Sequence, residues 1–181
     1  IGTVSGGGRS SKIFHRIVSL ENLLMAWREF SKGKRKKKDV ALFNLHLEDN
    51  LFMLHNELLQ ELYQPDVYAS FYVCDPKRRH IHKASVRDRV VHQAIFRVLN
   101  DTFDQTFIFD SYSSRVHKGT HAGVQRLQQF ARRVSRNYRT SAYVLKCDIR
   151  KFFDSVEHSL LEKFIFEKLG EDDRVQKFLR K

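Results

Sequence analysis

The sequence predicts an α+β fold that is mostly helical. Apolar residues recur at helical spacing in several long segments, and two runs that suit β-strands flank a turn with the sequence PKRRH. A short apolar run from Ala142 to Cys147 leads directly into Asp148. A chain of 181 residues is long enough for one domain with a sizeable core or for two small lobes.

The first 65 residues predict two helices after a segment, residues 1–12, that is rich in Gly and Ser and expected to be mobile. Ser19 is the expected N-cap of the first helix, which continues to Phe30. The second is expected from Val40 to Tyr63, because leucines recur along one face and Pro65 would stop it. Between them, six basic residues within positions 32–38 form either a solvated loop or a patch for a nucleic-acid backbone.

The remaining elements are expected in the following order. SFYVCD and HIHKASV form the strands of a hairpin with a basic tip, and RDRVVHQAIFRVLNDTF forms a helix. An extended loop then ends at Gly119, a basic amphipathic helix covers residues 121–136, and a strand covers residues 142–147. A helix from about Ser155 to Leu169, which Gly170 stops, and a short basic tail helix complete the chain.

The composition indicates an anionic partner. Lys and Arg together number 33 against 21 Asp and Glu, which gives a net charge of +12. No apolar stretch approaches the roughly 18 residues that a membrane span needs, so we expect nucleic acid and no membrane. The two cysteines, Cys74 and Cys147, favour a reduced, intracellular setting.

Asp148 is the candidate metal ligand. A carboxylate at the C-terminal end of a strand projects into the cleft where many α/β sheets bind ligands, and Mg²⁺ prefers such hard oxygen atoms. In polymerase chemistry two such ions hold the attacking and leaving oxygen atoms. Alternatively, Asp148 or Asp154 caps the following helix, and Glu157 lies three residues after Asp154, as in a capping box.

Three motifs resemble those of reverse transcriptases. KCDIRKFFDSVEH resembles their first catalytic motif, in particular that of the bacterial group with group II intron maturases and diversity-generating retroelements. SVRDRVVHQAI resembles the Asp-Arg-x-x-x-Gln motif, and DSYSSRVHKGTHAG resembles the Ser-Tyr-x-x-Arg loop. The resemblance covers roughly residues 66–165 in the order of the family. It implies an RNA-directed DNA polymerase, a nucleotidyltransferase that uses two Mg²⁺ ions and dNTPs to extend a DNA 3′ end.

The resemblance also implies roles around the first motif. Asp148 would be catalytic as the first of three metal-binding aspartates, and the backbone carbonyl of Ile149 would be a further metal ligand. Lys151 and Phe152 would present backbone amides to the triphosphate, and Phe153 would pack against the sugar and exclude a 2′-hydroxyl. A competing account places one of the two phenylalanines in the core.

The hairpin DPKRRHIHK would embrace the incoming nucleotide through Lys77 and Arg79. It departs from the family pattern, because the usual glycine turn is missing and Lys83-Ala84 replace an Ile-Pro pair, so Arg78 is an alternative to Lys77. Arg89 contacts nucleic acid or, equally, pairs with Asp88 or Asp104. The expected nucleic-acid-binding residues are Arg78, Arg89, Arg115, Lys118, Arg126 and Arg133.

By the same resemblance, residues 1–40 are an N-terminal extension, 41–140 the fingers subdomain, and 141–181 the beginning of the palm. No Tyr-x-Asp-Asp tetrapeptide is present, and Asp172-Asp173 is a poor substitute, so we expect this fragment not to polymerise alone. The implied partners in a bacterial cytoplasm are an RNA template, a DNA or RNA primer and dNTPs, with an accessory protein left open. The alternative is a non-catalytic, reverse-transcriptase-like RNA-binding module.

Overall fold

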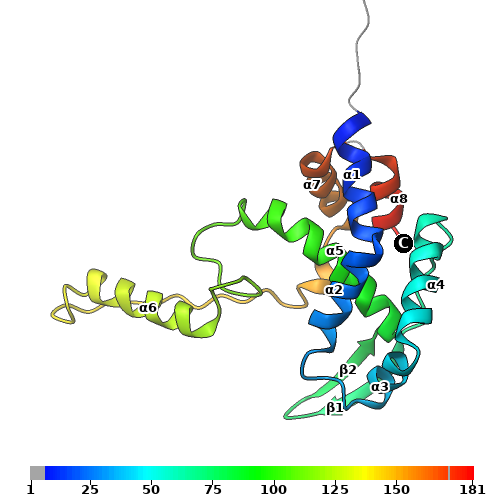
Figure 1. Cartoon of the computed structure of the whole chain (residues 1–181). Helices are drawn as coiled ribbons and strands as arrows, with labels where there is room; N and C mark the ends of the chain where they lie inside the picture. The colour runs from blue at the N-terminus through cyan, green and yellow to red at the C-terminus, as the bar shows by residue number, and fades with distance from the viewer. Residues whose placement is uncertain (1–6, 171) are drawn as a thin grey trace, which may run out of the picture. The chain divides into compact units, whose positions relative to one another are not determined.

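The computed structural model describes residues 7–170 and 172–181 (Figure 1). Residues 1–6, half of the segment expected to be mobile, lie outside the described residues, and a helix begins at Gly7. The elements are α1 (Gly7–Val18), α2 (Leu20–Ser31), α3 (Lys38–Leu45), α4 (Leu47–Leu59), β1 (Ala69–Cys74), β2 (Arg78–Lys83), α5 (Val86–Asp104), α6 (Thr120–Val134), η1 (Phe153–Ser155), α7 (His158–Leu169) and α8 (Asp173–Leu179).

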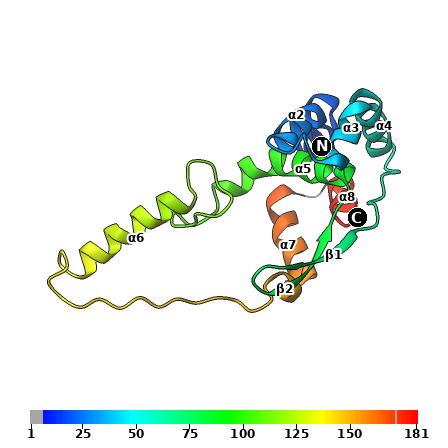
Figure 2. The same ribbon diagram turned by 90° about the horizontal axis from the view of Figure 1, so that it is seen from below.

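Among the described residues, eight α-helices accompany a single antiparallel sheet of two strands, which confirms the α+β, mostly helical prediction. Figure 2 shows β1 and β2 side by side, in a register that places Tyr72 opposite His80 and Val73 opposite Arg79. The predicted hairpin is therefore confirmed. No helix in this part of the chain is long and apolar enough to cross a membrane.

The chain divides into two compact units. The first comprises the described residues up to Asp101 together with Lys163–Lys181, and the second is Thr102–Glu162. These boundaries differ from those expected after residues 40 and 140. The expected boundaries separate functional subdomains, and they stay a prediction.

The core of the first unit forms where α2 packs against its neighbours. The hydroxyl oxygen of Ser19 accepts the backbone N–H of Asn22 at 3.2 Å, which confirms the predicted N-cap. The cap sets the start of α2, so that Leu23 and Trp27 are buried. Trp27 stacks on Phe43 of α3 with ring centroids 5.0 Å apart.

The single helix expected from Val40 to Tyr63 is instead two helices, α3 and α4, with a break at His46. In a continuous helix the carbonyl of Phe43 would accept the backbone N–H of Leu47. Here it accepts Nδ2 of Asn50 at 3.0 Å, because a side-chain amide can compete with the backbone for a carbonyl. Helix α4 ends at Leu59, ahead of Pro65, and Leu62, expected on the inner face, is 65% exposed.

Asp88 in the first turn of α5 is a charged side chain in the core, only 2% exposed. Its Oδ1 accepts the hydroxyl of Tyr63 at 2.7 Å, and its Oδ2 accepts the backbone N–H of Asp66 at 3.0 Å. Burial, together with this carboxylate, raises the pKa of Tyr63 far above its ordinary value, so the phenol stays a donor. The two bonds hold the segment before β1 against the start of α5.

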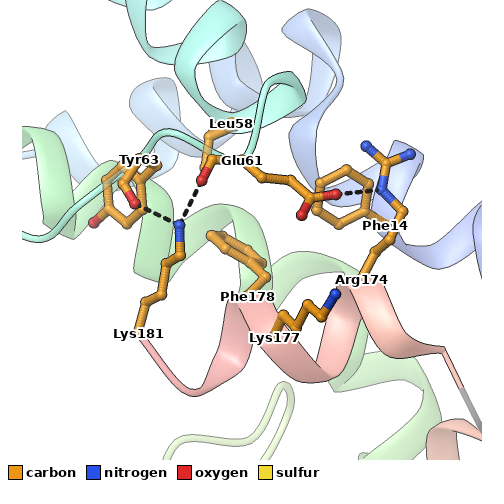
Figure 3. A pocket seen from close by; sticks show the side chains of 8 residues that line it. All are labelled: Phe14, Leu58, Glu61, Tyr63, Arg174, Lys177, Phe178 and Lys181. Carbon is orange, nitrogen blue, oxygen red and sulfur yellow. Dashed lines mark hydrogen bonds and ion pairs between the residues drawn. The ribbon is translucent and has the colours of Figure 1, made fainter.

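Helix α8 closes the first unit against α1 and the end of α4 (Figure 3). Arg174 pairs with Glu61 at 2.9 Å, and Nζ of Lys181 donates to the carbonyls of Glu61 and Tyr63 at 2.6 and 2.9 Å. The pocket between these side chains measures about 20 Å³, room for roughly one water molecule. Asp172 accepts two backbone N–H groups as the N-cap of α8, so its role here is structural.

The second unit lacks the predicted strand over residues 142–147. The segment is extended, but it has no hydrogen-bonded neighbour among the described residues, and Tyr143, Val144 and Leu145 are 96%, 75% and 88% exposed. The prediction was wrong because an apolar run encodes a tendency to extend, whereas a strand also needs a partner. The following helix, α7, begins at His158 after the short turn η1, not at Ser155.

We predict that Asp88→Ala lowers the free energy of unfolding by about 3 kcal/mol, because it leaves the buried Tyr63 hydroxyl and the Asp66 N–H without their acceptor. Urea denaturation followed by circular dichroism measures the change. Asp101→Ala is the control, since this aspartate is exposed, and we expect a change within about 0.5 kcal/mol. Equal losses in the two variants would contradict the structural role of Asp88.

Candidate functional site

The tip of the β1–β2 hairpin carries three exposed cations, Lys77, Arg78 and Arg79. The guanidinium of Arg78 lies over the ring of Tyr72, 4.1 Å from its centroid. Successive side chains of a strand point to opposite faces, so Arg78 and Arg79 cannot both reach a ligand on one face. Arg79 has no ion pair with any described residue and remains available as the expected phosphate ligand.

The base of the hairpin is fixed by Asp39, which follows the basic run. Its Oδ2 lies 2.7 Å from Nζ of Lys83 on β2 and 2.7 Å from Nη2 of Arg89 on α5. The hydrogen bond from Lys83, followed by that from Arg89, lowers the pKa of Asp39 to about 2. Lys83, a departure from the family pattern, therefore anchors the hairpin.

Arg89 takes the structural role that was one of its two expected alternatives, but with a different partner. It pairs with Asp39, not with Asp88 or Asp104, and lies 4.9 Å from the ring centroid of Phe30. The sequence did not predict this pair because Asp39 lies 50 positions before Arg89. Its contact with nucleic acid stays a prediction.

Arg115 closes the loop between α5 and α6. Its Nε lies 2.7 Å from Oδ1 of Asp104, and its Nη1 donates to the carbonyl of Ile108 at 3.0 Å. The hydrogen bond from the guanidinium lowers the pKa of Asp104. Because its donors are engaged within the loop, the geometry favours a bracing role for Arg115 over contact with a template.

Lys118 of this loop and Arg126 of α6 line an open pocket of about 370 Å³ in the second unit. Lys118 donates to the carbonyl of Phe109 at 2.7 Å and lies 3.7 Å from the centroid of its ring. Arg126 pairs with Asp110 at 2.9 Å and thereby lowers the pKa of that carboxyl group. Arg133 is exposed on α6 and has no ion pair within the described part of the chain.

The non-cationic residues of this pocket were not predicted from the sequence. The ring of Tyr112 packs against Gly123, where a Cβ would lie 3.4 Å from Cγ of the ring. Gln125 and Gln129 line the pocket from one face of α6. Their spacing of four residues is the one signal that would have paired them.

Asp148 and the residues after it are exposed to solvent. Phe152 and Phe153 lie edge to face with centroids 5.3 Å apart, and they are 51% and 87% exposed. The account that placed one of these rings in the core is therefore wrong for this structure. Asp154 belongs to η1 and α7 begins only at His158, so the predicted cap by Asp154 is not formed either.

The donor atoms near Asp148 fit only part of a magnesium site. A carboxylate and the carbonyl of Ile149 are hard oxygen ligands of the kind that Mg²⁺ takes. However, no three His, Cys, Asp or Glu residues of the described chain come together as a metal site. Asp148 lies in the second unit, whereas the hairpin cations lie in the first. The two halves of the predicted site therefore belong to different units.

No model of a known protein family matches the chain. The chain is similar to Protein YkfC of Escherichia coli (strain K12), with 24% identity over 133 residues, which cover 72% of this chain and 34% of that protein. The match thus spans about a third of the length of this relative. The name of the relative states no activity, so the similarity assigns none to this chain.

We predict an acid-sensitive contribution from Asp39. Its folded-state pKa of about 2 lies below the ordinary 3.8, so its stabilisation is complete above pH 3.8 and is lost as the pH falls towards 2. The side chain is 34% exposed, and solvent screening limits the contribution to about 1 kcal/mol. The free energy of unfolding of Asp39→Asn should therefore fall less steeply than that of the parent over this pH range.

The matched control is Asp49→Asn, which removes an exposed carboxylate that has no ion pair with any described residue. Its pH dependence should follow that of the parent. A parallel profile for Asp39→Asn as well would contradict the paired role of Asp39.

Proposed function

We propose that this chain forms the fingers and the beginning of the palm of a bacterial reverse transcriptase, which extends a DNA 3′ end on an RNA template. The observation that carries the proposal is the exposure of Asp148, Phe152 and Phe153. Both rings are open to a substrate. The resemblance of three motifs in family order supports the same function.

Each residue has a role in this proposal. The carboxylate of Asp148 and the carbonyl of Ile149 would hold Mg²⁺, which would supply positive charge to offset the charge that develops in phosphoryl transfer. Lys77 and Arg79 neutralise the triphosphate from the exposed hairpin tip. Lys151 and Phe152 contribute backbone amides, and Phe153 packs against the sugar of the incoming dNTP.

A second candidate is a non-catalytic, reverse-transcriptase-like module that binds RNA. The exposed cations Arg79 and Arg133, which have no ion pair with any described residue, suit RNA binding without catalysis. The net charge of +12 suits both candidates, because either one binds a polyanion. The two differ in chemistry and not in their partner.

We predict that the natural protein containing these residues extends a primer on an RNA template with dNTPs and Mg²⁺. Asp148→Asn should lower the extension rate by about 10³-fold, because an amide is a poor metal ligand. Asp154→Asn, an exposed carboxylate of the same segment, is the matched control and should retain most of the activity. Single-nucleotide extension under single-turnover conditions measures the rates.

Other outcomes of this experiment are equally informative. The natural protein and its Asp148→Asn variant could both fail to extend the primer and yet bind the RNA–DNA duplex in a salt-dependent way. In that case the RNA-binding module is the correct function and the polymerase is not. The 181-residue chain alone should not extend the primer. Extension by it would contradict the expectation that further catalytic aspartates are needed.

We also predict that Phe153→Ala lowers the preference for dNTPs over rNTPs by about 100-fold, because it opens the space that a 2′-hydroxyl would fill. Phe152→Ala is the matched control and should keep the preference. The ratio of kcat/KM for the two nucleotide classes is the measurement. An equal loss in both variants would remove the assignment of Phe153 as the residue that reads the sugar.

A further inference from the structure

The open pocket between the Ser-Tyr-x-x-Arg loop and α6 differs from the other cationic surfaces of the chain in its chemistry. Its volume of about 370 Å³ lies within the range of small-ligand sites. It combines an aromatic ring, Phe109, with two side-chain amides, Gln125 and Gln129, and two cations, Lys118 and Arg126. A surface that only tracks phosphates needs cations but neither amides nor rings.

The ring of Phe109 is positioned as a stacking surface. It is 68% exposed, although Lys118 lies 3.7 Å from its centroid and Arg126 lies 5.3 Å away. These cation–π contacts position the ring, and its exposed surface remains for a ligand. An exposed aromatic ring beside basic residues is a usual platform for an unstacked base.

The two amides supply the hydrogen bonds that a base edge requires. Gln125 and Gln129 are exposed on α6, and the side-chain amide of Gln125 has no hydrogen-bond partner among the described residues. Oε1 of Gln129 lies 3.4 Å from Nη1 of Arg126, which leaves its Nε2 free to donate. A side-chain amide can both donate and accept, so it matches the mixed edge of a nucleobase.

The positive charge around the pocket suits the phosphates that flank a base in a nucleic-acid strand. Arg126 is paired with Asp110, whereas Lys118 bonds a carbonyl oxygen and a ring and has no ion pair within the described part of the chain. Arg133 lies two helical turns beyond Arg126 on α6 and is exposed. Phosphates on either side of a bound base would therefore meet cations.

We propose that this pocket binds the base of one unpaired nucleotide in a single-stranded RNA. The inference rests on the proposed function for the choice of RNA over other strands, and it adds a base-binding subsite away from the Asp148 segment. Bases are accessible in single strands and hidden in duplexes, so the subsite would hold template that has not yet paired.

The test is equilibrium binding of the 181-residue chain to a fluorescent single-stranded RNA of about 12 nucleotides. Two variants probe the pocket, the double variant Gln125→Ala/Gln129→Ala and Phe109→Leu. We expect each to weaken binding by about tenfold, because each removes base contacts. Gln128→Ala and Phe107→Leu alter neighbouring exposed side chains outside the pocket lining and should bind as the parent does.

A second readout separates base contacts from charge. The double glutamine variant should keep the dependence of log K on log salt, whereas Lys118→Gln should reduce its slope by about 0.7. The parent should also bind an abasic strand of equal length about tenfold more weakly than the intact RNA. Because alanine favours helix at least as well as glutamine, thermal unfolding should show α6 unaffected.

Equal binding of intact and abasic strands, or no difference between the pocket variants and their controls, would overturn the proposal. If the pocket variants bind single-stranded DNA more weakly than the parent does while their binding to RNA is unchanged, the assignment to RNA is overturned. The assay contains neither dNTPs nor Mg²⁺, so its result is independent of polymerisation. A protein that passes this test and fails primer extension is an RNA-binding module that retains the pocket.

Discussion

The first unit depends on one buried carboxylate, that of Asp88. Burying a charged group is costly unless its oxygen atoms are hydrogen-bonded, and here Tyr63 and the backbone of Asp66 supply the bonds. These donors come from the segment between α4 and β1, so the carboxylate decides where the hairpin leaves the helical core. The adjacent Arg89 reaches Asp39, which in turn holds Lys83 at the base of the hairpin.

The Asp-Arg-x-x-x-Gln motif is therefore a structural brace in this chain. Asp88 fixes the entry to the hairpin, Arg89 fixes its base, and Gln93 donates to Glu29 of α2 at 2.8 Å. Three residues near the start of α5 thus connect to three other parts of the first unit. Such an arrangement leaves the cations at the hairpin tip free for a ligand, because the bonds that hold the hairpin lie at its other end.

The second unit is held together differently. Helix α6 has no buried residue, and the loop before it is organised by the pairs of Arg115 with Asp104 and Arg126 with Asp110. Each exposed ion pair contributes little to the free energy of unfolding, so the main effect of these pairs is to fix the positions of the loop residues. They place Phe109 and Lys118 beside the glutamines of α6. The candidate binding residues of this unit therefore lie on its surface and not in a packed interior.

The sequence by itself determined the local elements of the fold. Ser19, the leucines of α4 and the aromatic and β-branched runs around PKRRH encode caps, faces and strands through short-range spacing, so the α+β class and the hairpin were predictable. The basic excess and the position of Asp148 were visible in the same way. The resemblance to reverse transcriptases added roles that spacing alone does not provide.

Only the tertiary structure decided the rest. The pairing of Arg89 with Asp39 and the burial of Asp88 join residues that are far apart in sequence, and no local pattern encodes such distances. The break at His46 depends on which donor reaches one carbonyl. The run from Tyr143 to Cys147 is extended without being a strand, because a strand is a property of two segments and a sequence pattern describes one.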